Sequence, residues 1–243
     1  MIMGLSTDAS NKVFNNIAAR YDLVNAFLSF GFHQSWRVRL AQALPAQTTS
    51  VLDLACGTAA IPLALARYRD KITNIVGVDI SENMLTIGKT RVSKAVADRR
   101  INLLQGDALD LPMGADTFDA VTVGFALRNV PDIMRLFITA YRVLKPSGSF
   151  AVLEFSRPKG GLAVVLHSFY LGFMVPLAGL LLTGNWAAYQ HLGRSILSFP
   201  DRNRFLRMFC QAGFKDVCVT SMAFGAVTLY LAKKDELPQV SLK

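Results

Sequence analysis

The sequence predicts an α/β protein built on a largely parallel sheet. Three short apolar runs lead to acidic residues at Asp53, Asp79 and Asp107, and a helix-length segment separates each run from the next. This alternation is typical of parallel strands joined by crossover helices. Two more apolar runs, at 118–125 and 149–155, extend the predicted sheet.

The helices are predicted from apolar spacing and from residues that cap helix ends. Apolar residues recur at helical spacing early in the chain, so residues 10–44 are expected to form a helical cap before the first strand. Ser81 is a suitable N-cap for a helix that runs to about residue 97, and Gly213 is a suitable end for a helix over 205–212. Further helices are expected over 59–67 and 133–144.

Two last apolar runs, at 217–221 and 227–232, are separated by only a few residues. Neighbouring strands joined so closely form an antiparallel hairpin, so one of them must run against the rest of the sheet. The expected product is a single domain with a seven-stranded sheet. Its parts are the cap at 10–44, a core at 45–156, an apolar lid at 157–199, a C-terminal helix and hairpin at 200–233, and a tail at 234–243.

The segment 162–183 contains no charged residue and is long enough to span a bilayer. A single span would place the last hairpin across the membrane from the other strands and cut the sheet. Gly172, Pro176 and Gly179 also interrupt the run. We therefore expect two short helices that form an apolar lid over the ligand crevice, and an ordinary buried helix pair remains the alternative.

The bulk composition limits the compartment and the partners. Lys and Arg outnumber Asp and Glu by 26 to 17, a net charge of +9, which suits anionic partners or general solubility. The three cysteines are too few and too scattered for a disulfide framework or a metal site. The N-terminus lacks the pattern of a signal peptide, so a cytoplasmic location is expected.

The acidic residues predict the cofactor. Ligands of such sheets bind beyond the carboxyl ends of the strands, so all three carboxylates are expected to line one crevice. Asp79 can accept both ribose hydroxyls of an adenosine group, and Asp107 with Ala108 is expected beside the adenine. Asp53 near the first strand suits a positively charged cofactor, which favours S-adenosylmethionine (SAM) over NAD. The turn at Gly57 and Thr58 lets the backbone approach that ligand.

The substrate side is predicted from the segment after the fourth strand. Arg128 and Asn129 would place a fixed cation and an amide at the crevice mouth, where they could hold a phenolate-type oxygen and activate the neighbouring ring carbon. Arg is a poor proton acceptor because it stays protonated, so its expected role is electrostatic. Tyr21 is a candidate proton relay. The alternatives are a loop-shaping salt bridge for Arg128 and a core aromatic for Tyr21.

Several segments, taken together and in order, carry a family resemblance. Among them are Ala19-Arg20-Tyr21-Asp22, Leu52-Asp53-Leu54-Ala55-Cys56-Gly57-Thr58, Leu127-Arg128-Asn129-Val130, Tyr141-Arg142-Val143-Leu144-Lys145-Pro146 and Leu153-Glu154-Phe155-Ser156. With them, the whole chain from about 13 to 233 resembles the ubiquinone/menaquinone biosynthesis C-methyltransferase (UbiE) family. The resemblance implies a class I SAM-dependent methyltransferase fold, SAM as donor, no metal, and C-methylation of a polyprenylated quinol. It places Gly124, with Thr58, Asp79, Asp107 and Ala108, on cofactor positions, and Tyr21, Arg128 and Asn129 on substrate positions.

Three residues depart from the family pattern. In the cofactor turn, Ala59 and Ala60 stand where the family has Gly and Asp. After the fourth strand, Gly124 stands where Ser is common. The added methyl of Ala59 is expected to crowd the methionine part of SAM, and the lost carboxylate to weaken the grip on its amine.

The resemblance favours the conversion of demethylmenaquinol to menaquinol. The benzoquinol step of ubiquinone biosynthesis, another lipid methyltransferase, an RNA methyltransferase and a non-catalytic scaffold of a quinone-synthesis complex remain open, although no nucleic-acid-binding segment supports RNA. The expected partners are the quinol and an anionic membrane surface, to which each nearby Lys or Arg would add roughly 1 kcal/mol. The expected location is the inner face of the membrane, and a homodimer is left open.

Overall fold

The computed structural model describes residues 26, 29–95, 100–158, 160–183 and 186–235. Within these ranges a seven-stranded sheet has the order β3-β2-β1-β4-β5-β7-β6. Strands β1 to β5 are parallel, and β7 is antiparallel to β5 and β6, which confirms the predicted C-terminal hairpin. The strands are β1 (Ser50–Leu54), β2 (Asn74–Asp79), β3 (Ile101–Gln105), β4 (Phe118–Gly124), β5 (Leu144–Phe155), β6 (Lys215–Met222) and β7 (Val227–Lys233).

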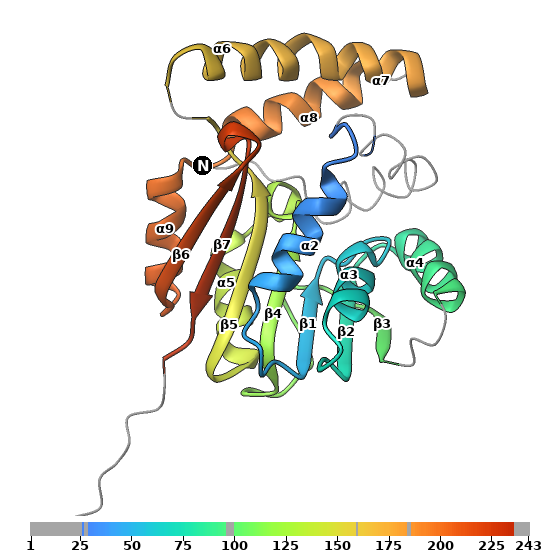
Figure 1. Ribbon diagram of the computed structural model, residues 1–243, viewed down its shortest axis with the longest axis vertical. Coiled ribbons are helices and arrows are strands. Elements are labelled where there is room, and N and C mark those ends of the chain that lie inside the picture. Colours follow the sequence, from blue (N-terminus) through green and yellow to red (C-terminus); the bar gives the residue numbers. More distant parts are fainter. Residues whose placement is uncertain (1–25, 27–28, 96–99, 159, 184–185, 236–243) are drawn as a thin grey trace, which may run out of the picture.

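Helices cover both faces of the sheet (Figure 1). On one face α2 and α3 pack around Leu40 and Leu65, while on the other α5 and α9 bury the aromatic rings of Phe137 and Phe209. In the described part of the chain, both faces of the sheet are therefore covered by helices. The helices in these layers are α2 (His33–Ala43), α3 (Ala60–Tyr68), α4 (Glu82–Lys94), α5 (Ile133–Val143) and α9 (Arg202–Gln211).

Local sequence signals set most helix ends correctly. The Ser81 hydroxyl accepts a hydrogen bond from the amide of Met84 at 3.3 Å, so the predicted N-cap of α4 is confirmed. Helix α9 begins at Arg202, before the predicted residue 205, because the Asp201 side chain caps it. The predicted helix at 10–25 lies outside the described residues.

The C-terminal end of α2 is hydrogen-bonded to Arg69, the residue that follows α3. Its guanidinium donates to the carbonyl oxygens of Ala41, Leu44 and Pro45 at 2.5–2.7 Å. The last carbonyls of a helix have no partner within the helix, and Ala41 in the last turn of α2 is one of them. These bonds join the end of α2 and the residues after it to the end of α3.

The apolar insertion differs from the expected pair of short helices. Helix α6 (Gly161–Phe169), the π-helical turn η2 (Tyr170–Met174) and α7 (Val175–Thr183) follow one another as one continuous rod, seen at the top of Figure 1. The expected break is wrong because a π turn widens the helix just before Pro176. That widening accommodates the missing amide and the ring of a proline without ending the helix.

Helix α8 (Trp186–Ser198) returns beneath this rod and packs closely against it (Figure 1). Gly179 lies against the ring of Tyr189, where an added Cβ would stand 2.1 Å from that ring. Gly193 likewise lies against the carbonyl of Leu171. The rod and α8 therefore form a tightly packed helical pair beyond the carboxyl edge of the sheet.

Candidate active site

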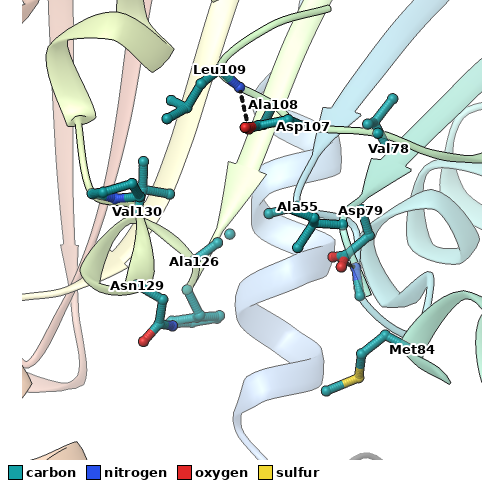
Figure 2. Close-up of a pocket in the computed structure, with 16 residues that line it drawn as sticks. Ala55, Val78, Asp79, Met84, Asp107, Ala108, Leu109, Ala126, Asn129 and Val130 are labelled. Atoms are coloured by element: carbon teal, nitrogen blue, oxygen red, sulfur yellow. Dashed lines mark hydrogen bonds between the residues drawn. The ribbon is translucent and has the colours of Figure 1, made fainter. Parts of the chain in front are cut away.

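A cavity opens at the carboxyl ends of β1, β2 and β4. Figure 2 shows its two walls, with Asp79 and Met84 on one side and Ala126, Asn129 and Val130 on the other. The described lining consists of Ala55, Gly57, Val78, Asp79, Ile80, Met84, Gly106, Asp107, Ala108, Leu109, Gly124, Phe125, Ala126, Asn129, Val130 and Pro131. No residue of α6, α7 or α8 belongs to it.

Asp79 is the last residue of β2, and backbone amides fix its carboxylate. Its Oδ2 accepts from the amide of Gly57 at 2.7 Å, and its Oδ1 accepts from the amide of Ser81 at 2.9 Å. Burial raises the pKa of Asp79, while these hydrogen bonds lower it. Each carboxylate oxygen still has a further acceptor site, so the group can also receive the two hydroxyls of a ribose.

Asp107 follows β3 and lines the same cavity, above Asp79 in Figure 2. Its Oδ1 accepts from the amide of Leu109 at 2.8 Å, which makes an Asx turn. The turn fixes the carboxylate beside Ala108 and leaves its other oxygen for a ligand donor. Asp107 can therefore make this turn and still accept a hydrogen bond from a ligand.

Three residues of the turn after β1 have left-handed backbone conformations. Gly57, Ala55 and Ala59 all have positive φ, at 53°, 52° and 62°. An added Cβ at Gly57 would meet nothing within 4 Å, so the backbone there faces open space. The Ala59 methyl is fully buried in a cluster with Leu85 and Leu103 and does not line the cavity. The expected crowding of the cofactor by Ala59 is therefore wrong, because this methyl packs against α4.

Asp53 also departs from its predicted place. It lies inside β1, paired with Gly77 and beside Thr122, and its side chain is 1% exposed. The apolar strand continues through Leu54, so Asp53 does not stand beyond the strand end as Asp79 does. Its Oδ1 accepts from the Thr122 hydroxyl at 2.5 Å, and burial raises its pKa to about 8. The expectation that all three carboxylates line one crevice is wrong for Asp53.

Thr58 and Gly124 are two other predicted cofactor residues, and of these Gly124 lines the cavity whereas Thr58 does not. Thr58 is buried behind the turn, and its hydroxyl accepts from Arg91 at 3.0 Å. Gly124 lines the cavity, and a Cβ built on it would lie 2.4 Å from the Cδ1 of Ile61. Ile61 thus fills the space that a serine side chain would need, which gives the Gly124 departure a packing reason.

Arg128 and Asn129 point in different directions. They occupy the 3₁₀ turn η1 (Leu127–Asn129), in which successive side chains are about 120° apart. Asn129 lines the cavity, whereas Arg128 is 5% exposed, forms an ion pair with Glu154 and lies 4.8 Å from the ring centre of Phe155. The expected free cation at the crevice mouth is therefore an ion pair behind it. Tyr21 lies outside the described residues.

Glu154 is the polar residue that the site prediction missed. It stands one residue before the end of β5, as Asp53 does in β1, so a search for acidic residues at the ends of apolar runs would have found it. The cavity residues Phe125, Ala126, Val130 and Pro131 were also missed, although they flank Asn129 in sequence.

The residues present fit SAM. Asp79 and Asp107 offer anionic acceptors for the ribose hydroxyls and the adenine amine, and Met84, Val78 and Leu109 offer apolar surface for the adenosine rings. Gly57 presents backbone to open space next to them. An acidic, apolar-sided cavity of this kind suits a nucleoside that carries no phosphate.

Comparisons with known proteins agree with this geometry. Residues 2–234 match the model of the ubiE/COQ5 methyltransferase family. The chain is 39% identical to a demethylmenaquinone methyltransferase of Halalkalibacterium halodurans, over 95% of this chain and 94% of that protein. A ubiquinone/menaquinone biosynthesis C-methyltransferase UbiE of Rickettsia felis is 37% identical over 92% of both chains.

Solved structures show the fold. The [4+2]-cyclase SpnF has a TM-score of 0.69 at 16% identity and covers 97% of this chain and 98% of its own. A SAM-dependent methyltransferase of Thermotoga maritima has a TM-score of 0.64 at 18% identity, over 93% of this chain and all of its own. Because one of these is described as a cyclase, the fold alone does not fix the reaction. Together, the whole-length family match, the sheet order and the acidic cavity identify the chain as a member of the ubiE/COQ5 methyltransferase family, with the class I fold and SAM as its cofactor.

Proposed function

We propose that the protein methylates a ring carbon of demethylmenaquinol to give menaquinol. The observation that carries this proposal is the whole-length similarity to proteins named demethylmenaquinone methyltransferase, at 39% identity in both Halalkalibacterium halodurans and Geobacillus stearothermophilus. The latter match covers 92% of this chain and 96% of that protein.

Bound SAM supplies an electrophilic methyl group on a sulfonium, and the protein must orient the ring and exclude water. Asp79 and Asp107 hold the adenosine end. On the opposite wall the Asn129 amide is the polar group placed to bond a ring hydroxyl, while Phe125 and Val130 keep that region apolar. Arg128, held by Glu154 behind this wall, does not line the cavity and instead fixes the turn η1 that carries Asn129.

The test is turnover of purified protein with SAM and demethylmenaquinol in detergent, read by mass spectrometry. The expected product carries one added methyl on the ring carbon and none on oxygen. Asn129→Ala should lower turnover more than it weakens SAM binding. Absence of quinol methylation by a protein that binds SAM would reject this substrate.

The benzoquinol step of ubiquinone biosynthesis is the second candidate. The Rickettsia felis relative named for both quinones is almost as similar as the relatives named for menaquinone, at 37% identity. The same assay with a demethylated benzoquinol distinguishes the two, because the preferred ring gives the higher kcat/KM.

We also propose that the apolar rod α6–α7 lies on the membrane at its cytoplasmic face and admits the polyprenyl tail. Gly161–Leu181 is long and apolar enough to cross a bilayer, yet only 28% of its most apolar window is buried. The rod exposes Leu162, Val165, Leu166, Phe169, Phe173 and Leu181. Arg157 precedes it and Arg194 is exposed on α8, so basic groups flank the apolar surface as anionic headgroups require.

Vesicle flotation tests this location. The wild type should float with vesicles that contain phosphatidylglycerol, and less well in high salt. Phe169→Ser with Phe173→Ser, which removes two stacked exposed rings, should reduce flotation. Ile138→Ser removes an equally exposed apolar side chain from α5 and should not. Equal flotation of the double variant and the wild type would reject the rod as the contact.

A further inference from the structure

We infer that Glu154 is a positioning residue of the methyl-transfer site, which fixes the substrate-side wall of the cavity and directs Arg128. The inference deepens the proposed function and rests on it for the identity of the substrate. Glu154 does not line the cavity, so it acts through the groups that it holds.

The Glu154 carboxylate accepts three hydrogen bonds, two of them from the turn η1 that follows β4. Its side chain is 1% exposed, and its Oε2 accepts from the amide of Leu127 at 3.1 Å. Its Oε1 accepts from the amide of Phe155 at 2.8 Å and from the guanidinium of Arg128. Burial raises the pKa of Glu154, while the charge of Arg128 and the backbone hydrogen bonds lower it. Two of the three donors belong to η1, so this carboxylate anchors the turn.

Residues 124–131, which include the anchored turn η1, form the cavity wall opposite Asp79 and Met84 (Figure 2). Six of the lining residues come from it, and these are Gly124, Phe125, Ala126, Asn129, Val130 and Pro131. Phe125 has a φ of 57°, a left-handed conformation that costs free energy for a bulky residue. A strained segment persists only where its surroundings hold it, and here Glu154 and the carbonyl of Leu153, which accepts from the amide of Phe125 at 2.8 Å, do so.

Arg128 contacts both Glu154 and Phe155, yet one of its hydrogen-bond donors has no partner among the described residues. Glu154 takes one of its terminal nitrogens, and the Phe155 ring lies 4.8 Å from its guanidinium carbon. Its Nε is buried and has no hydrogen-bond partner in the part of the chain that the structure describes. Arg128, like Glu154, does not line the cavity, so the ion pair acts on the site by fixing the position of η1 and of Asn129 next to it.

Phe155 connects the cavity wall at Phe125 to the helical pair formed by the rod and α8. Its ring lies 4.7 Å from the ring of Phe125 and packs against the cluster of Leu171, Val175, Tyr189 and Ile196 between the insertion and α8. The adjacent residues Glu154 and Phe155 thus tie the strained wall to the sheet and to the helical pair above it.

The experiment compares Glu154→Gln with Thr228→Val. Gln keeps the shape of Glu but removes the charge. Thr228 is the β7 residue paired with Glu154, is fully buried, and bonds Ser156 at 2.7 Å, so its variant perturbs the same neighbourhood without touching η1. The measurements are the unfolding temperature, SAM affinity, kcat and KM for demethylmenaquinol, and hydrogen exchange of residues 124–131.

In Glu154→Gln we expect at least a tenfold loss of kcat, SAM affinity within threefold of wild type, and at least tenfold faster exchange in 124–131. In Thr228→Val we expect a lower unfolding temperature with kcat within twofold and exchange in 124–131 unchanged. A Glu154→Gln protein with wild-type kcat and exchange would overturn the inference, as would equal losses in both variants. Hydrogen exchange needs no substrate, so it tests the anchoring even if the quinol assay rejects the proposed function.

Discussion

Replacing Asp79 with alanine should abolish most of the affinity for SAM while leaving the fold intact. Asp79 is the residue whose geometry best fits a ribose, because two backbone amides already orient its carboxylate. A hydrogen bond to a charged group contributes about 1.5–3 kcal/mol. Loss of two such bonds, partly offset by water entering the space, should cost roughly 3 kcal/mol, or about a hundredfold in Kd.

Isothermal titration calorimetry with SAM measures this change, and the unfolding temperature without ligand shows whether the variant is folded. Asp70→Asn removes the same formal charge from an exposed residue outside the cavity and should leave Kd within twofold. An Asp79→Ala protein that is folded and binds SAM within threefold of wild type would show that this carboxylate does not hold the ribose.

Three further changes test the fold around the site. Gly179→Ala drives a methyl into the Tyr189 ring and should cost about 1–3 kcal/mol, seen as faster proteolysis of the insertion, and unchanged proteolysis would disprove the tight packing. Arg69→Ala removes the guanidinium that donates to the carbonyls of Ala41, Leu44 and Pro45 and should lower the urea midpoint, and an unchanged midpoint would show that these bonds do not stabilise the fold. Asp53 has a pKa of about 8 when folded and a lower one when unfolded, so the native state binds more protons between about pH 4 and 8 and stability falls as pH rises through that window. Asp53→Asn, read by unfolding temperature against pH, should flatten that fall, and an unchanged slope would argue against a neutral Asp53.

Much of the fold follows from local sequence patterns. The apolar runs place β1, β2, β4 and β5 close to their observed positions, and Ser81 starts α4 as predicted. Strand β5 begins at Leu144 instead of 149, because the turn residues after α5 join the strand through a register shift against β4. Such pairing depends on a partner strand and not on the local sequence.

The candidate site is predicted less completely, because its side chains meet across long sequence separations. Asp79 and Asp107 reach the cavity as expected, since the carboxyl ends of parallel strands meet at one edge of the sheet. Arg128 was predicted at the crevice mouth because it follows the fourth strand, but its orientation is decided by Glu154, 26 residues away. Nothing in the local pattern of either residue specifies that contact.

By itself the sequence determined the order of strands and helices, the acidic residues at the strand ends and the family, because these depend on periodicity and motifs within short segments. Only the tertiary structure decided that Asp53 is buried beside Thr122, that Arg128 is paired with Glu154, and that the apolar insertion is one continuous rod packed on α8. The physical reason is that burial, ion pairing and helix packing are properties of surfaces brought together from distant parts of the chain. Their free energies depend on the partner that folding supplies.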